Sequence, residues 1–203
     1  MPHEAFTILT VCSGNLCRSP MAEQLLRARL GDLPGVGVES AGVVAQDGDP
    51  MPTEAAALSR SYGGDPSGHS ARRLVEAQIA NANLVLAMAR EHRRDVVTLW
   101  PRASRYTFTV REFARLAEGI DADDFASIDS LPGDDVPGRL NAAIELLASR
   151  RGFVDAAPTQ EDDDVIDPYR RDDAAYALSG QQLVPAVEAV VALLRRAAAH
   201  PGA

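Results

Sequence analysis

The chain opens with a strand-like run that leads through a short loop into a helix-like run. Residues 6–11 read FTILTV, an apolar and β-branched stretch of the length of a buried strand. Residues 12–19 read CSGNLCRS, and Pro20 suits the first turn of the helix indicated by the two-sided pattern of residues 21–27. A strand, loop and helix in this order predict an α/β fold with a mostly parallel sheet.

Later segments repeat this alternation along the chain. Further strands are predicted at residues 36–40, 83–88 and 106–108, and helices at residues 53–61, 90–97, 110–117 and 183–194. Between residues 120 and 164 the pattern breaks into aspartates mixed with proline and glycine, which predicts an acidic loop with a short helix over 140–147. We therefore expect a single domain over residues 1–203 that carries an acidic loop insertion at about 120–164.

Charge and composition exclude several classes of protein. The 203 residues carry a formal net charge of -9, which argues against non-specific binding to nucleic acid or to an anionic membrane. We see no N-terminal targeting segment and no apolar stretch of about 18 residues, so we expect no membrane partner and a cytoplasmic location. The sequence leaves the oligomeric state open.

Cysteine and histidine usage argues against a metal site. The two cysteines, Cys12 and Cys17, both lie in the opening loop and are too few for a disulfide framework or a zinc site. The histidines show no metal-ligand spacing; they are His3, His69, His92 and His200. We therefore predict no metal and no cofactor.

The opening loop has the residues that an oxyanion site needs. A loop between a strand and a helix N-terminus points several N–H donors at one place, and Gly14 and Asn15 tolerate the backbone geometry that this requires. Arg18 adds a planar fork that matches two phosphate oxygens. Cys12 lies at the loop start, where these donors favour a thiolate. Cys17 is either a small apolar filler or a redox partner.

The motifs resemble those of the low-molecular-weight protein tyrosine phosphatases. VCSGNLCRSPMAE at residues 11–23 is similar to that family's phosphate-binding loop, and SAG at 40–42, HSARRL at 69–74, NLVLAM at 83–88 and DPY at 167–169 follow in the family's order. The resemblance implies a flavodoxin-like, doubly wound fold with a four-stranded parallel sheet and helices on both faces. It also implies hydrolysis of phosphotyrosine in proteins through a cysteinyl-phosphate, and hence a phosphotyrosine protein, such as a tyrosine kinase or one of its targets, as partner.

The resemblance assigns roles to individual residues. Cys12 is the expected nucleophile, Arg18 the phosphate ligand and Asp167 the general acid, while Tyr169 is expected to line the substrate slot. The expected phosphate-binding residues are Ser13, Gly14, Asn15, Leu16, Cys17, Arg18 and Ser19. One carboxyl group can protonate the leaving phenolate and then activate water. Residues 43–47 read VVAQD where the family often has an aromatic residue, which predicts a weaker aromatic clamp.

Two other functions compete with this one. An arsenate reductase of the same fold is an alternative, but no cysteine follows Cys17, so an external thiol would have to resolve the adduct. A redox-sensing phosphate-binding module is the other, although such a module is expected to have lost Cys12, Arg18 or the acid. Turnover of p-nitrophenyl phosphate against arsenate with thiol separates these functions.

Overall fold

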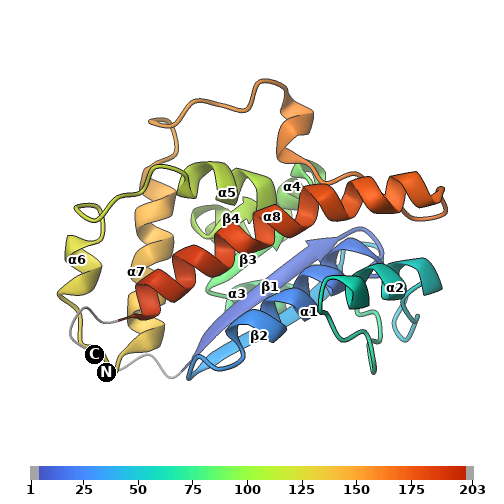
Figure 1. The fold of residues 1–203 in the computed structure, drawn as a ribbon, viewed down its shortest axis with the longest axis horizontal. Coiled ribbons are helices and arrows are strands. Elements are labelled where there is room, and N and C mark those ends of the chain that lie inside the picture. The colour runs from blue at the N-terminus through green and yellow to red at the C-terminus, as the bar shows by residue number, and fades with distance from the viewer. Residues whose placement is uncertain (1–4, 200–203) are drawn as a thin grey trace.

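The fold is a parallel sheet with helices on both faces (Figure 1). A computed structural model describes residues 5–199. The strands are β1 (Phe6–Cys12), β2 (Val36–Gly42), β3 (Leu84–Ala87) and β4 (Thr107–Thr109), in the order β2-β1-β3-β4, and all neighbours are parallel. The predicted α/β doubly wound class and the four-stranded parallel sheet are therefore confirmed.

Helices connect the strands and fill the C-terminal part of the chain. They are α1 (Arg18–Leu30), α2 (Thr53–Ser61), α3 (Glu76–Asn81), α4 (Arg90–Leu99), α5 (Val110–Ala117), α6 (Ala126–Asp129), α7 (Val136–Ser149) and α8 (Asp173–Ala198). Short 3-10 helices cover Pro101–Arg105 and Gln160–Asp163. The short α3 was not predicted, because its six residues give too little length for a helical period.

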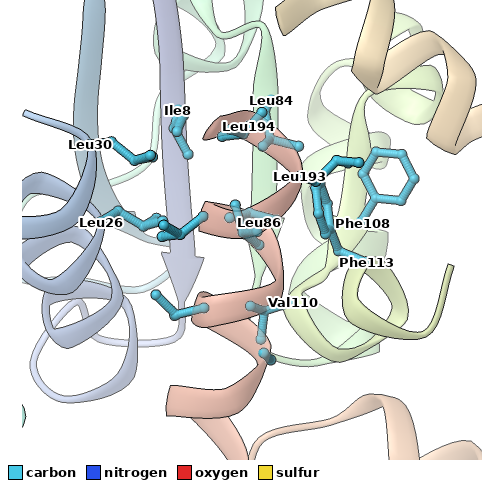
Figure 2. Close-up of a cluster of buried hydrophobic side chains, with 14 of the residues drawn as sticks. Ile8, Leu26, Leu30, Leu84, Leu86, Phe108, Val110, Phe113, Leu193 and Leu194 are labelled. Atoms are coloured by element: carbon cyan, nitrogen blue, oxygen red, sulfur yellow. The ribbon is translucent and has the colours of Figure 1, made fainter. Parts of the chain in front are cut away.

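The strands β1, β3 and β4 bury both of their faces. Successive side chains of β1 point to opposite sides, so Ile8 joins the cluster under α1, α5 and α8, whereas Leu9 joins the cluster that contains Ile79 of α3 and Val96 of α4. Figure 2 shows the first cluster, with Leu194 of α8 beside the strand residues. Burial on both faces explains why β1 and β3 are rich in apolar residues without a polar alternation.

The helix α8 is the longest element and crosses the sheet (Figure 1). By length and composition alone its 26 residues could span a membrane. In this fold, however, half of its most apolar window is buried, and its apolar stripe packs on α1, α5 and α7. The stripe is formed by Leu183, Val187, Val190 and Leu194. The apolar residues of α8 are therefore explained by their burial in the core.

The expected acidic loop at about 120–164 is not a loop throughout. Its centre forms the 14-residue α7, which buries Leu140, Ile144 and Leu147 in the main core. Asp135 caps this helix by accepting a hydrogen bond from the Gly138 amide at 3.0 Å. The aspartates that suggested a loop thus serve in part as helix caps, and the helix is longer than the short one predicted.

A buried arginine ties this segment to the end of α8. Arg139 is fully buried, and its guanidinium donates to the carbonyl oxygens of Ile128 at 2.8 Å and Ala197 at 2.7 Å. A buried charge needs such hydrogen bonds, because an unpaired one costs several kcal/mol. The insertion is therefore packed as part of the α/β unit.

Candidate active site

A tight loop joins the carboxyl end of β1 to the first turn of α1. Asn15 has a left-handed backbone with φ of 55°, a conformation that Asn tolerates better than other non-glycine residues. Gly42, opposite Cys12 on β2, lets the loop approach closely, because an added Cβ would lie 2.6 Å from both the Asn15 nitrogen and the Ser13 oxygen. The glycine of the SAG motif at residues 40–42 thus leaves space for the loop beside β2.

A buried polar network holds the loop from behind. The Asn15 side chain donates to Ser19 Oγ at 2.9 Å and to Ser40 Oγ at 2.8 Å. Ser40 in turn donates to the buried carboxylate of Glu23. Ser19 Oγ lies 3.0 Å from Cys12 Sγ, within hydrogen-bonding distance. These contacts order the loop before any ligand arrives, and they place a hydroxyl beside the Cys12 sulfur.

The front of the loop offers N–H donors. Among residues 5–199, no backbone or side-chain acceptor takes a hydrogen bond from the amides of residues 13–17. The buried Arg18 Nε likewise has no acceptor in that part of the chain. A buried donor without a partner, such as Arg18 Nε, is costly, and a bound ion is one explanation for it. The loop, together with the positive end of α1, is therefore suited to an oxyanion.

The structure brings Asp167 against Arg18, although they are far apart in the sequence. Arg18 Nη2 lies 2.7 Å from Asp167 Oδ2, and Arg18 Nη1 donates to the Val165 carbonyl at 3.0 Å. Arg18 is almost fully buried, whereas the Asp167 side chain is about half exposed. Asp167 is thus at the open side of the site, where a leaving group would depart.

The segment before Asp167 is held by ion pairs. Asp163 pairs with Arg115 at 2.9 Å, and Asp164 pairs with Arg90 at 3.1 Å. The acidic run at 161–164 is therefore not simply solvated: two of its members anchor the loop that carries Asp167. After Asp167, the Tyr169 amide donates to Asp167 Oδ1 at 3.1 Å, which turns the chain.

A pocket of about 290 Å³ lies over the loop. Its lining includes most of the predicted site: Cys12, Ser13, Gly14, Leu16, Cys17, Arg18, Asp167 and Tyr169. Asn15 and Ser19, which were predicted as phosphate-binding residues, are fully buried and do not line the pocket; their side chains support the loop instead. Asp49, Gln46 and the exposed Val44 complete the wall where an aromatic residue is absent.

Cys17 faces inward as well as lining the pocket. It is 6% exposed and packs with Ala55 and Tyr176 from α2 and α8. Burial, with a smaller contribution from Cys12, raises the pKa of the Cys17 thiol to about 12. Both cysteines are free thiols. Cys17 is therefore a neutral thiol at pH 7.

His92 was not predicted as a site residue. It is 1% exposed in the first turn of α4, and its Nε2 lies 2.8 Å from Ser13 Oγ. A lone histidine inside a charged helical run carries no local signal, because only the pairing of β1 with β3 brings α4 to the loop.

Neither a metal cluster nor the largest groove offers an alternative nucleophile site in the part of the chain that the structure describes. Within residues 5–199, no group of three or more His, Cys, Asp or Glu residues could hold a metal ion; His3 and His200 lie outside the described residues. A groove of about 920 Å³ between α5, α8 and residues 157–163 is larger than the loop pocket, but its lining has no cysteine, serine or histidine. The loop pocket, which is lined by Cys12 and Ser13, is therefore the candidate site for nucleophilic catalysis.

Known proteins of one family resemble this chain over much of its length. A family model described as low molecular weight phosphotyrosine protein phosphatase matches residues 7–129. The low molecular weight protein-tyrosine-phosphatase Etp of Escherichia coli (strain K12) is 43% identical over 95 residues, which span 47% of this chain and 62% of Etp. A protein-arginine-phosphatase of Geobacillus stearothermophilus is 39% identical over 120 residues, or 59% of this chain and 79% of that protein.

Solved structures extend the likeness over almost the whole fold. The YwlE arginine phosphatase from Geobacillus stearothermophilus matches with a TM-score of 0.65 and 27% identity, covering 94% of each chain. A low molecular weight protein tyrosine phosphatase from T. tengcongensis matches with a TM-score of 0.63 and 28% identity, covering 93% of this chain and 99% of that one. With a family model that matches more than half of its residues, the chain belongs to the low molecular weight phosphotyrosine protein phosphatase family.

Proposed function

We propose that this protein is a cysteine-dependent phosphatase that removes phosphoryl groups from phosphotyrosine in proteins. The observation that carries the proposal is the presence of Cys12, Arg18 and Asp167 in one pocket, with Arg18 and Asp167 2.7 Å apart. These are a nucleophile, an anion ligand and a proton donor, which are the groups that a two-step phosphoryl transfer needs.

In the first step, the Cys12 thiolate attacks phosphorus while the bond from phosphorus to the leaving oxygen breaks. Loop amides and Arg18 stabilise the charge on the phosphoryl oxygens. Asp167 donates its proton to the leaving phenolate oxygen. In the second step, water attacks the cysteinyl-phosphate, Asp167 takes a proton from that water, and phosphate and the thiolate are released.

Substrate binding changes the partner of Asp167. In the structure the Asp167 carboxylate is paired with Arg18. A bound phosphoryl dianion would take over the Arg18 guanidinium and place its own negative charge near Asp167. Release from Arg18 would leave the Asp167 carboxyl group free to face the leaving oxygen, as the first step requires.

The walls of the pocket support phosphotyrosine as substrate. Leu16, Val44 and Tyr169 give an apolar and aromatic surface next to the nucleophile, and Tyr169 is 40% exposed. A ring of the size of tyrosine packs on such a surface. A phosphotyrosine protein, such as a tyrosine kinase or one of its targets, is accordingly the proposed partner.

Phosphoarginine in proteins is a second candidate substrate. It is favoured by the arginine phosphatase of Geobacillus stearothermophilus, which matches both by sequence and by structure, and by Asp49, which lines the pocket with Asp167. Two carboxylates could accept hydrogen bonds from a guanidinium leaving group. Values of kcat/KM for matched phosphotyrosine and phosphoarginine peptides separate the two candidates, and a preference for phosphoarginine would overturn the first.

The test of the reaction class uses small substrates. We expect turnover of p-nitrophenyl phosphate in the presence of EDTA, loss of turnover in Cys12→Ser, and no reduction of arsenate with added thiol. Arsenate reduction without phosphatase turnover would favour the reductase alternative. A cytoplasmic location and reversible oxidation at Cys12 are also part of the proposal; the second is supported by the place of Cys12 in the lining of the pocket.

A further inference from the structure

His92 connects a neighbouring helix to the phosphate-binding loop. Its imidazole is almost completely buried, and Nε2 lies 2.8 Å from the hydroxyl oxygen of Ser13. The contact follows from the sheet: Val11 pairs with Ala87, and the Met88 amide donates to the Val11 carbonyl at 2.8 Å. The first turn of α4 is thereby placed beside the loop.

His92 is neutral at pH 7. Burial, and to a smaller extent the charge of Arg18, lower the pKa of His92 to about 4. Asp167 and Asp164 act in the opposite direction but do not overcome these effects. A neutral imidazole has one N–H, so one ring nitrogen donates and the other accepts.

The surroundings place that proton on Nε2. Nδ1 of His92 is buried and has no hydrogen-bond partner among residues 5–199. A proton on Nδ1 would bury an N–H group without an acceptor, which is rarer in proteins than an under-satisfied acceptor. Near Nε2, in contrast, lie Ser13 Oγ and, at 3.5 Å, the carboxylate oxygen Oε1 of Glu91. Nε2–H therefore donates to Ser13 Oγ.

This direction of donation determines what Ser13 can do. Because Ser13 Oγ accepts from His92, its own hydrogen is left to donate elsewhere. Ser13 lines the pocket together with Cys12 and Arg18. We propose that His92 is a positioning residue that orients the Ser13 hydroxyl to donate a hydrogen bond to the phosphoryl group bound by the loop.

The proposal rests on the proposed function and deepens it at the same site. Its test therefore measures binding of inorganic phosphate by calorimetry, which does not require turnover, alongside kcat and KM for p-nitrophenyl phosphate. Ser13→Ala should weaken phosphate binding about tenfold or more, as expected for loss of a hydrogen bond to a charged group. His92→Leu should cost about the same factor, and the double variant no more than either single one, because the two residues act as one unit.

A conservative variant and a control separate positioning from stability. His92→Gln keeps an N–H donor at the reach of Nε2, so its phosphate affinity should return close to that of the wild type. Val96→Ala, a cavity at a fully buried position of the same helix, should lower the melting temperature and leave phosphate affinity within about twofold. If His92→Leu does not fold, the phosphate affinities of Ser13→Ala and His92→Gln still test the proposal.

Several results would overturn the proposal. They are an unchanged phosphate affinity in Ser13→Ala, losses that multiply in the double variant, and a His92→Gln protein that binds phosphate as weakly as Ser13→Ala. Nitrogen-15 NMR at pH 7 adds a direct readout: the Nε2–H tautomer of His92 is expected, and the Nδ1–H tautomer would contradict the assignment. If the wild type binds phosphate but hydrolyses no phosphate ester, the proposed function is refuted, whereas the phosphate affinities of the variants still test the role of His92.

Discussion

Arg18 Nη2 and Asp167 Oδ2 lie 2.7 Å apart, and they join the first helix of the fold to the loop before the last one. The guanidinium is nearly buried and the carboxylate half exposed. The pair holds Asp167, the proposed proton donor, in the same pocket as Cys12, the proposed nucleophile, and it must separate when a phosphoryl group takes Arg18. The same contact is thus part of the resting structure and of the proposed reaction.

Asp167→Asn tests the proton donor. We expect kcat for phenyl phosphate to fall by about 10²–10⁴, the usual contribution of a general acid. The fall should be smaller for p-nitrophenyl phosphate, because nitrophenolate leaves without full protonation. Steady-state kinetics with a series of aryl phosphates measures this dependence on the leaving group.

Asp134→Asn is the matched control for that series, because Asp134 is exposed, precedes α7 and does not line the pocket. It should keep the leaving-group dependence of the wild type. An Asp167→Asn protein that loses the same factor with every leaving group would show that Asp167 does not protonate the leaving oxygen.

Gly42→Ala tests the close approach of β2 to the loop. The new Cβ would lie 2.6 Å from the Asn15 nitrogen and from the Ser13 oxygen, so the loop must shift. We expect a large loss of phosphate affinity and turnover, and a lower free energy of unfolding by about 1–3 kcal/mol. Gly37→Ala on the same strand is the control, since its nearest neighbour, Thr7 Oγ1, would be 4.0 Å away. Equal activity of the two variants would contradict the role of Gly42.

The strands, the loop and the terminal helix could be predicted from sequence because their signals are local. Residues 6–11 are buried except for the partly buried Thr7, and residues 12–20 carry loop and helix signals in order. Helix α7 was underestimated because aspartates, Pro137 and Gly138 look like a loop until Asp135 is seen to cap a helix. His92 could not be found, because its role depends on the contact between α4 and the loop, which only the tertiary fold creates.

The pKa of His92 predicts how stability depends on pH. It is lowered from 6.5 to about 4, so between these values the unfolded chain binds a proton that the folded protein does not. The free energy of unfolding therefore rises with pH over this range, by about 3 kcal/mol from this residue, and this contribution is lost on acidification towards pH 4. Denaturant unfolding of wild type and His92→Gln at several pH values isolates it. Parallel stability curves for the two proteins would be evidence that His92 titrates normally.

Recovery of activity after oxidation depends on the thiol of Cys17. Peroxide should convert Cys12 to a sulfenic acid, which the Cys17 thiolate can attack, forming a disulfide as water leaves. With the Cys17 pKa raised to about 12, the thiolate is scarce at pH 7 and increases about tenfold with each pH unit. Without that disulfide, excess peroxide carries the sulfenic acid on to a sulfinic acid, which dithiothreitol does not reduce. After excess peroxide, we therefore expect recovery of activity with dithiothreitol to be small at pH 7 and larger at pH 9 in the wild type, and small at both in Cys17→Ala. Equal recovery of both proteins at pH 9 would leave Cys17 a packing residue only.

The central claim is that Cys12 carries the phosphoryl group during turnover. The direct measurement is rapid acid quenching of the protein during turnover of p-nitrophenyl phosphate, followed by mass spectrometry of its peptides. We predict one phosphoryl group on the peptide with Cys12 and Cys17, located at Cys12 by fragmentation and absent in Cys12→Ala. Turnover without a phosphoryl group on Cys12, or wild-type activity in Cys12→Ala, would contradict the account.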